Sequence, residues 1–183
     1  PTTTPAPTPT PTPSTPGASP TTTPAPTASP VPTRTPVATM VVRAYFVLDG
    51  EIGVEGLVPT LRDVPESVAV ARAAMDVLLD GRILADYDSL SSAIPAGTRL
   101  LGLSVNDGIA TVDLSREFES GGGSASTFYR LGQVVYTLTQ FSTIDAVRFQ
   151  VEGRTVTTFG SEGVILDGPQ SRADFEDQLP AIF

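Results

Sequence analysis

The sequence predicts an α+β domain in which two helices pack on one face of a small mixed, mainly antiparallel sheet, preceded by a disordered Pro/Thr-rich tract. Three observations lead to this fold class. The composition changes abruptly near residue 40, two later segments carry apolar residues at helical spacing, and the segments around them alternate apolar and polar residues between turn-forming glycines. Strands interleaved with two helices are typical of a layered α+β fold.

The tract comprises residues 1–39, and the folded domain comprises residues 40–183. Most of the 18 prolines lie before residue 37, and Arg34 is the only charged residue of the tract. Such a segment buries too little apolar surface to offset the entropy of ordering, so we expect a disordered, extended linker. Its Ser/Thr/Pro mixture also suits an O-glycosylated stalk. Because the chain begins with Pro1, we expect a secretory leader or a lipid-anchored Cys to precede it.

Two strands open the domain. Residues 40–48, MVVRAYFVL, form a continuous apolar run of strand-forming residues and predict a central strand. After a glycine-rich loop, residues 57–64 predict a second, weaker extended segment. Pro59 has no N–H to donate to a neighbouring strand, so this segment is expected at the edge of the sheet.

The first helix is predicted over residues 66–81. Its buried face is expected to consist of Val68, Ala71, Met75 and Leu78. Asp63 and Glu66 have the spacing of a capping box, and Gly81 is placed for a C-cap. The polar loop that follows is expected to insert Leu90 and Ile94 into the core.

Two β-hairpins are predicted. Around the first turn, the alternating apolar residues are Leu101, Leu103 and Val105, then Ala110, Val112 and Leu114. Residues 106–108, Asn-Asp-Gly, supply the positive φ angles that such a turn requires, and no further calcium ligands follow at the spacing of a calcium loop. In the second hairpin, the residues expected to face the core are Val147, Phe149 and Val151. Residues 152–153 form its turn, and residues 155–159 return.

The second helix is predicted over residues 126–141. Its apolar residues recur at steps of three and four: Phe128, Leu131, Val134, Val135, Leu138 and Phe141. A strand would instead place Gln140 on the same side as Val134. Ser124 or Ser126 is expected to cap the helix, and the preceding glycines are expected to form a flexible loop that lacks a phosphate-loop pattern. Three residues are expected on its flanks and exposed side: Tyr136, Thr137 and Thr139.

The last segment has a short apolar run and then a helical turn predicted at residues 172–179. The chain stops at Phe183, so the apolar end is expected either to pack back on the domain or to lead into a further domain.

The composition excludes several classes of function. The folded part holds all 20 acidic residues but only 10 of the 11 Arg, which gives it a net charge of −10. Such a domain repels nucleic-acid phosphates and anionic lipid headgroups. The chain has no Cys, His, Trp or Lys, so disulfides, thiolate metal sites and Cys nucleophiles are excluded. No apolar run approaches the roughly 20 residues that span a membrane. We predict neither a cofactor nor a metal.

An enzyme with this composition must rely on carboxylates, as glycosidases do. Two acidic pairs have the i, i+2 spacing that shares one side of an extended segment: Glu117 with Glu119, and Asp86 with Asp88. A carbohydrate- or small-ligand-binding module is therefore the alternative prediction. The absence of Trp, the usual sugar platform, weighs against it.

The folded part resembles the GerMN domain, the sporulation and spore germination domain of bacterial envelope lipoproteins. The matching phrases are VVRAYFVL with LVPTLRDVP, AMDVLLDG, IPAGTRLLGLSVNDGIATVDLSREF, LGQVVYTLTQFSTIDAVRFQVEG and the closing DGPQSRADFEDQLPAIF. The resemblance implies an extracytoplasmic domain, tethered through a lipoprotein signal and a flexible linker. It also implies a fold similar to the ring-building motif of envelope channel and secretion rings, a role in protein–protein interaction or assembly, and no catalytic residue set.

The sequence therefore predicts a non-catalytic, exported interaction domain at the bacterial cell surface, held at the membrane only through a missing N-terminal anchor. The predicted partner is an envelope protein, and nucleic acid is not expected. Exposed residues of helix 126–141 are predicted to contact it: Tyr129, Arg130 and Tyr136. Self-association is a variant of this prediction, because the segments at 57–62 and 154–159 leave backbone groups available to a neighbouring strand.

Overall fold

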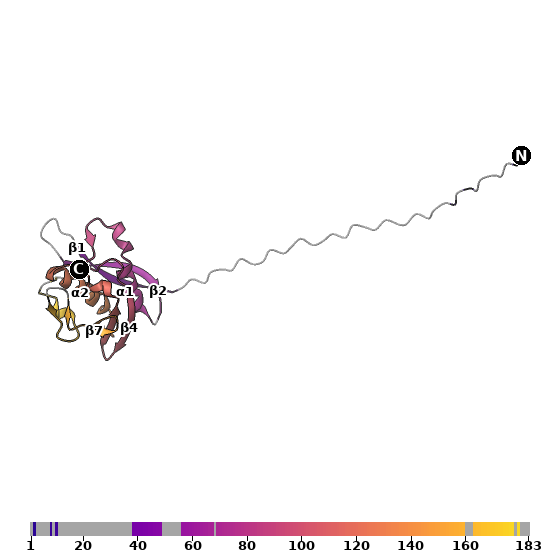
Figure 1. The fold of residues 1–183 in the computed structure, drawn as a ribbon. Coiled ribbons are helices and arrows are strands. Elements are labelled where there is room, and N and C mark those ends of the chain that lie inside the picture. Colours follow the sequence, from indigo (N-terminus) through magenta and orange to yellow (C-terminus); the bar gives the residue numbers. More distant parts are fainter. Residues whose placement is uncertain are drawn as a thin grey trace. The chain divides into compact units, whose positions relative to one another are not determined.

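A computed structural model describes residues 2, 8, 10, 38–48, 56–67, 69–159, 163–177 and 179 (Figure 1). The chain divides into two units, Pro1–Thr35 and Pro36–Phe183. The predicted linker lies almost wholly outside the described residues, and its disorder stays a prediction. The loop at 49–55, the side chain of Val68 and the end after Leu179 also lie outside them.

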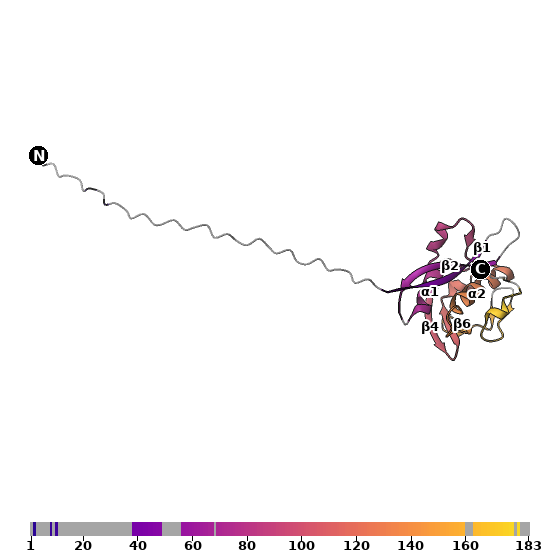
Figure 2. The same ribbon diagram turned by 180° about the vertical axis from the view of Figure 1, so that it is seen from behind.

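The first sheet contains the strands β1 (Thr39–Leu48), β2 (Gly56–Pro65) and β3 (Leu90–Ser91), in the order β2-β1-β3. β1 and β2 pair antiparallel over ten residues each, and Figure 2 shows them side by side. The central position of β1 and the edge position of β2 are confirmed. The second strand is not weak, since it pairs along its whole length.

The second sheet contains β4 (Leu100–Asn106), β5 (Ile109–Leu114), β6 (Ala146–Val151) and β7 (Arg154–Thr155), in that order. β5 and β6 run parallel, and the other pairs are antiparallel. Both predicted turns are confirmed, because Asp107, Gly108, Glu152 and Gly153 all have positive φ. The return after the second turn pairs only over Arg154–Thr155.

The α+β class with mixed, mainly antiparallel pairing is confirmed, but the described strands do not form a single sheet. A third, two-stranded sheet joins β8 (Thr158–Phe159) and β9 (Val164–Ile165). The prediction that both helices pack on one face of a single sheet is therefore wrong. The helices instead lie between the separate sheets and against them.

The apolar face predicted for β4 is wrong at two positions. Leu101 is the extra residue of a bulge, so Leu100 pairs with Leu114 and takes the inner side while Leu101 is 44% exposed. Val105 lies opposite the buried Ala110, but β4 is an edge strand, and Val105 stays 41% exposed.

Helix α1 (Val70–Asp80) begins later than predicted and buries Ala74, Met75 and Leu78. Of the predicted face, Met75 and Leu78 are confirmed, whereas Ala71 is only half-buried. Gly81 ends the helix in the left-handed conformation, as predicted. The predicted capping box is wrong. Asp63 belongs to β2, which continues through Pro65, and the N-cap is Ala69 without a side-chain hydrogen bond.

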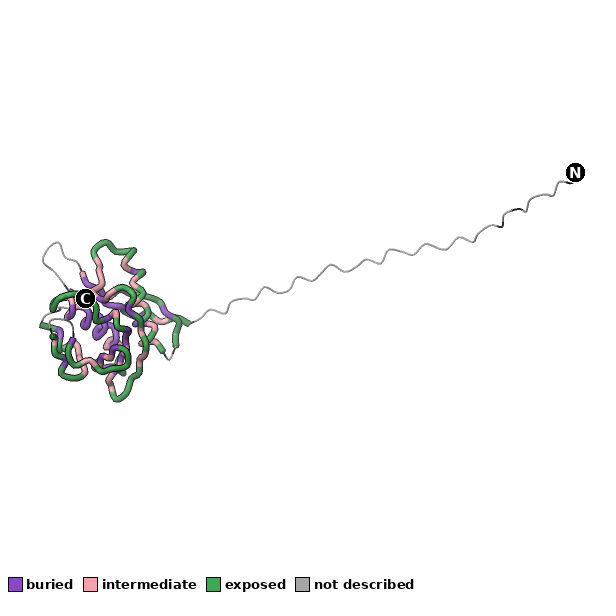
Figure 3. The backbone as a smooth tube through the Cα atoms, in the orientation of Figure 1, coloured by how far each residue is buried: buried purple, intermediate pink, exposed green. Residues whose placement is uncertain are grey.

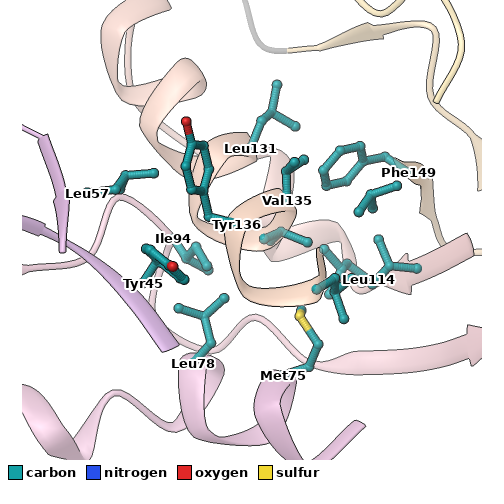
Figure 4. Packing of buried hydrophobic residues seen from close by; sticks show 14 of the residues in the cluster. Tyr45, Leu57, Met75, Leu78, Ile94, Leu114, Leu131, Val135, Tyr136 and Phe149 are labelled. Carbon is teal, nitrogen blue, oxygen red and sulfur yellow. The ribbon is translucent and has the colours of Figure 1, made fainter. Parts of the chain in front are cut away.

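Helix α2 (Ser124–Leu138) is the centre of the domain, and all its residues from 130 to 138 are buried (Figure 3). Figure 4 shows Tyr45 and Leu57 of the first sheet on one side of this helix and Leu114 and Phe149 of the second sheet on the other. A helix covered on all sides is held by tertiary packing rather than by its intrinsic propensity. Its N-cap is Gly123 without a side-chain hydrogen bond, so the predicted serine caps are wrong.

The predicted helical turn near the end is a short 3₁₀ helix, η3 (Arg172–Asp174), which begins with a capping box between Ser171 and Asp174. Beyond it, Phe175 and Leu179 are buried against the domain. The described part of this segment therefore packs back on the core, whereas the two outcomes predicted for the chain end at Phe183 concern residues outside those described.

Candidate interaction surface on the first sheet

One edge of β1 is closed by side chains of α2. The backbone N–H of Tyr45 donates to Thr137 Oγ1 at 3.1 Å, and the backbone N–H of Arg43 donates to Gln140 Oε1 at 2.8 Å. In return, Gln133 Nε2 donates to the Tyr45 carbonyl at 3.0 Å, and Gln140 Nε2 donates to the Arg43 carbonyl at 2.7 Å. Gln133 and Thr137 lie four residues apart on one face of α2, and Gln140 follows in the turn after the helix. Together these three side chains replace a neighbouring strand.

The other edge of this sheet, the outer side of β2, is open. Since Arg43 and Tyr45 direct their backbone groups toward α2, the alternation of an antiparallel pair directs those of Val42, Ala44 and Phe46 toward β2. The same alternation turns the backbone groups of Leu57, Pro59, Leu61 and Asp63 outward. Pro59 therefore occupies a position where a missing N–H costs no ladder bond. No described strand pairs with this edge.

Two large apolar side chains are exposed beside the open edge. Val41 is 57% exposed and Leu61 is 61% exposed. Leu61 lies opposite Arg43, and Val41 lies opposite Asp63, so all four side chains lie on one face of the sheet. We call this surface, formed by Val41, Arg43, Leu61 and Asp63, the β1–β2 face.

A pocket of about 460 Å³ adjoins this face, and we call it the arginine pocket. It is lined by Arg43, Tyr45, Thr139, Gln140 and Arg172. Arg172 donates from Nε to Thr139 Oγ1 at 2.8 Å and from Nη2 to the Tyr136 carbonyl at 3.1 Å. Its guanidinium carbon lies 5.6 Å from the ring centroid of Tyr45 and 4.8 Å from that of Tyr136. These contacts hold its guanidinium group in a fixed orientation.

Of the three predicted contact residues, Arg130 and Tyr136 are each only 2% exposed, which corrects the expectation that they lie on the surface. Thr137 is also buried, and Thr139 is half-buried. The hydroxyl of Tyr136 donates to the Leu179 carbonyl, and its pKa is raised by burial and by the negative charge of Glu176. Tyr129 alone among the three predicted residues retains intermediate exposure.

Arg130 is buried because it binds three backbone carbonyls outside α2. Nε donates to Ala93 at 3.1 Å, Nη1 to Phe118 at 2.6 Å and Nη2 to Gly121 at 3.0 Å. The guanidinium carbon also lies 5.9 Å from the ring centroids of Phe118 and Phe159. Burial lowers its pKa. This side chain organises the glycine-rich loop, which was predicted to be flexible.

The acidic pairs do not assemble into a catalytic site. Glu117 and Glu119 lie on a 3₁₀ helix, η2 (Arg116–Glu119), where residues two apart point in different directions. The pKa of Glu117 is lowered, chiefly by a hydrogen bond with Ser115, whereas a general acid requires a raised pKa. Asp86 pairs with Arg62 at 3.1 Å, and Asp88 is exposed. Among the described residues, no group of three acidic side chains is placed to hold a metal ion.

A further pocket, of about 510 Å³, lies between the end of α1 and the loop through Gly97. Its only charged residue is Asp80, which is paired with Arg82 at 2.8 Å. It therefore presents no unpaired charge to a substrate.

No described helix is long and apolar enough to cross a membrane.

The family described as "Germane: Sporulation and spore germination" matches residues 43–157, more than half of the chain. The chain belongs to this family. No match is found among curated proteins. The matched region includes most of the first sheet, both helices and all of the second sheet, whereas Arg172 lies beyond it.

Three solved structures share the fold of this Germane domain. The tandem GerMN domains of the sporulation protein GerM from Bacillus subtilis match with a TM-score of 0.62 and 22% identity, over 75% of this chain and 48% of that one. The first GerMN domain of the same protein matches with a TM-score of 0.63 and 24% identity, over 74% and 100%. A candidate lipoprotein from Clostridium perfringens matches with a TM-score of 0.52 and 19% identity, over 78% and 95%. The chain thus spans about half of the tandem structure, and likeness at these identities establishes the fold.

Proposed function

We propose that this Germane domain is a non-catalytic, extracytoplasmic interaction module that contacts an envelope protein through the β1–β2 face and the open edge of β2. Its relation to a sporulation protein and to a candidate lipoprotein supports an envelope location. In this proposal, residues 1–39 act as a flexible tether that joins the domain to an N-terminal membrane anchor.

The proposal rests on the exposure of Val41 and Leu61, which distinguishes them from the other apolar side chains of the sheet. Both side chains are more than half exposed on regular strands beside an unpaired backbone edge. Burying one such side chain at an interface is worth about 1.5–3 kcal/mol. An extended segment of a partner can add to the edge of β2 and cover Leu61 in the same step.

The chemistry of the described residues supports a role without catalysis. The chain has no His, Cys or Lys, and the lowered pKa of Glu117 keeps its carboxylate ionised at neutral pH. A glycosidase places a general acid and a general base in one site. No pocket described for this domain is lined by two acidic side chains.

The proposal is tested by placing a photo-crosslinking amino acid at Leu61 of the full-length protein in cells of its source organism. The matched control is the same amino acid at Leu101, which is 44% exposed on the second sheet. We expect a discrete adduct with an envelope protein from position 61 and none from position 101. An adduct of twice the protein's own mass would identify a second copy as the partner instead. Absence of any adduct at position 61, or equal adducts at both positions, would contradict the proposal.

A further inference from the structure

We propose that the arginine pocket is a binding site for a carboxylate group presented by a peptide. The inference rests on the proposed function for the class of partner, and it names the chemical group that this partner offers. The site combines residues of three separate segments, β1, the end of α2 and η3.

The pocket concentrates positive charge in a domain that is otherwise acidic. Arg43 and Arg172 both line it, and among the described residues neither forms an ion pair. The folded part as a whole carries twice as many acidic residues as arginines. Two guanidinium groups that line one pocket, neither of them in an ion pair among the described residues, favour the binding of an anion between them.

Arg172 is oriented to use a specific pair of donors. Its two hydrogen bonds come from Nε and Nη2, which form one edge of the guanidinium plane, so the edge formed by Nη1–H and the second Nη2–H remains available. That edge matches the two oxygens of a carboxylate in a bidentate pair. The rings of Tyr45 and Tyr136 limit the motion of the group, which reduces the entropy lost on binding.

The neutral polar residues of the pocket do not compete for the ligand. Thr139 Oγ1 donates to the Val135 carbonyl and accepts from Arg172. The side-chain amide of Gln140 is occupied by both backbone groups of Arg43 and by the Thr137 carbonyl. Recognition therefore depends on the two arginines, and the neighbouring groups hold the walls of the pocket in place.

The charge balance favours a carboxylate over a phosphate. Glu176 lies close enough to raise the pKa of Tyr136, so its negative charge also acts near Arg172. The lining of the pocket carries two guanidinium groups and no carboxylate, so a single carboxylate ligand does not give it an excess of negative charge. A dianionic phosphate would add a second negative charge to a domain of net charge −10.

The surroundings favour a peptide as the source of this carboxylate. Arg43 lies on the β1–β2 face, directly opposite Leu61 and two residues from Val41. A ligand held by Arg43 therefore has exposed apolar side chains within reach of its next residues. An acidic side chain and the C-terminus of a peptide both offer a carboxylate with apolar neighbours, and the probes below distinguish these two sources.

The test is an NMR titration of the isotope-labelled full-length protein with three probes: N-acetyl-leucine, which carries an α-carboxylate, N-acetyl-glutamate α-amide, which carries a side-chain carboxylate, and inorganic phosphate. We expect the amide signals of Tyr45, Thr139 and Arg172 to shift with a carboxylate probe, and to shift less with phosphate at equal concentration. The carboxylate probe that binds more tightly identifies the source. Equal or tighter binding of phosphate would overturn the assignment, as would the absence of any shift at these residues.

The substitution Arg43→Gln is expected to weaken carboxylate binding by roughly fivefold, because it removes one partly exposed charge and none of the internal bonds of the pocket. Arg43→Lys keeps the charge and is expected to retain most of the affinity. The control is Arg72→Gln, which removes an exposed arginine from α1 and should leave the affinity unchanged. Equal affinity of Arg43→Gln and the unsubstituted protein would refute the site. A cross-link at position 61 without probe binding refutes the pocket alone, and probe binding without a cross-linked protein refutes the proposed partner alone.

Discussion

The two edges of the β1–β2 sheet end in opposite ways. On the β1 side, Gln133 and Thr137 of α2 and Gln140 just after it bind the backbone groups of Arg43 and Tyr45, so this part of the edge is closed by side chains. On the β2 side, no strand of the described residues covers the edge, and Pro59 is the feature that limits pairing there.

In this part of the molecule, polar side chains are buried and large apolar side chains are exposed, which is the reverse of the usual distribution. Gln133 and Thr137 are fully buried, yet Leu61 and Val41 are more than half exposed. Buried amide and hydroxyl groups are stable only when they are hydrogen-bonded, and here their partners are the backbone groups of Arg43 and Tyr45, which no described strand pairs on that side of β1. The exposed side chains of Val41 and Leu61 have no such partner within the domain, so they are available to another protein.

Among the substitutions at the closed edge, Gln133→Leu is expected to reduce the free energy of unfolding the most. The leucine keeps a similar volume but leaves the Tyr45 carbonyl and the Ala93 N–H, both bound by Gln133, without their partner. Each unsatisfied buried group costs about 1–3 kcal/mol, so we expect the free energy of unfolding to fall by about 2–4 kcal/mol in chemical denaturation.

The matched control for this substitution is Gln150→Leu on β6, because Gln150 is only half-buried and makes no side-chain hydrogen bond among those described. It should change the free energy of unfolding by no more than about 0.5 kcal/mol. Similar losses for both variants would show that the closed edge contributes no special stability.

A smaller effect is expected from Thr137→Val, which changes a hydroxyl into a methyl group of nearly the same shape. The substitution leaves the backbone N–H of Tyr45 without its acceptor, at a site that is fully buried. We expect a loss of about 1–2 kcal/mol in the same denaturation experiment. Thr143→Val, at an exposed position after the helix, provides the comparison. A neutral result for Thr137→Val would mean that water replaces the hydroxyl at this edge.

The order of the strands and helices along the chain was predictable because it follows from apolar periodicity and turn residues. The central strand, the Asn-Asp-Gly turn and the helical character of the second long segment all agree with the structure. The closed edge was not predictable in the same way. Gln133, Thr137 and Gln140 recur at helical spacing, but polar residues at that spacing are typical of a solvated face. Only the position of β1 beside the helix shows that they replace a strand.

The candidate site was predictable in part. Pro59 indicated the open edge, since a proline is tolerated only where no ladder bond is needed. The exposure of Val41 was not indicated, because it lies in a continuous apolar run that reads as buried on both sides. Arg172 is far from Arg43 in the sequence and beyond the matched family region, so no local pattern connects the two residues. Burial of Arg130 was missed for the same reason, because its three carbonyl partners lie in η2 and in two loops, where no local pattern connects them to α2.

Leu61→Lys is expected to have the smallest effect on stability. It also tests directly whether the open edge binds a partner. Leu61 is 61% exposed, so the lysine can stay in water, and the free energy of unfolding should change by no more than about 0.5 kcal/mol. A charge at this position cannot be buried in an interface without a partner, and lysines on edge strands oppose pairing with another protein. With the photo-crosslinker placed at Val41, the adduct yield should therefore fall at least tenfold in the Leu61→Lys background and stay unchanged with Leu101→Lys. If Leu61→Lys unfolds the domain, or if the adduct persists in a folded variant, the two edges do not differ in the way that their hydrogen bonding indicates.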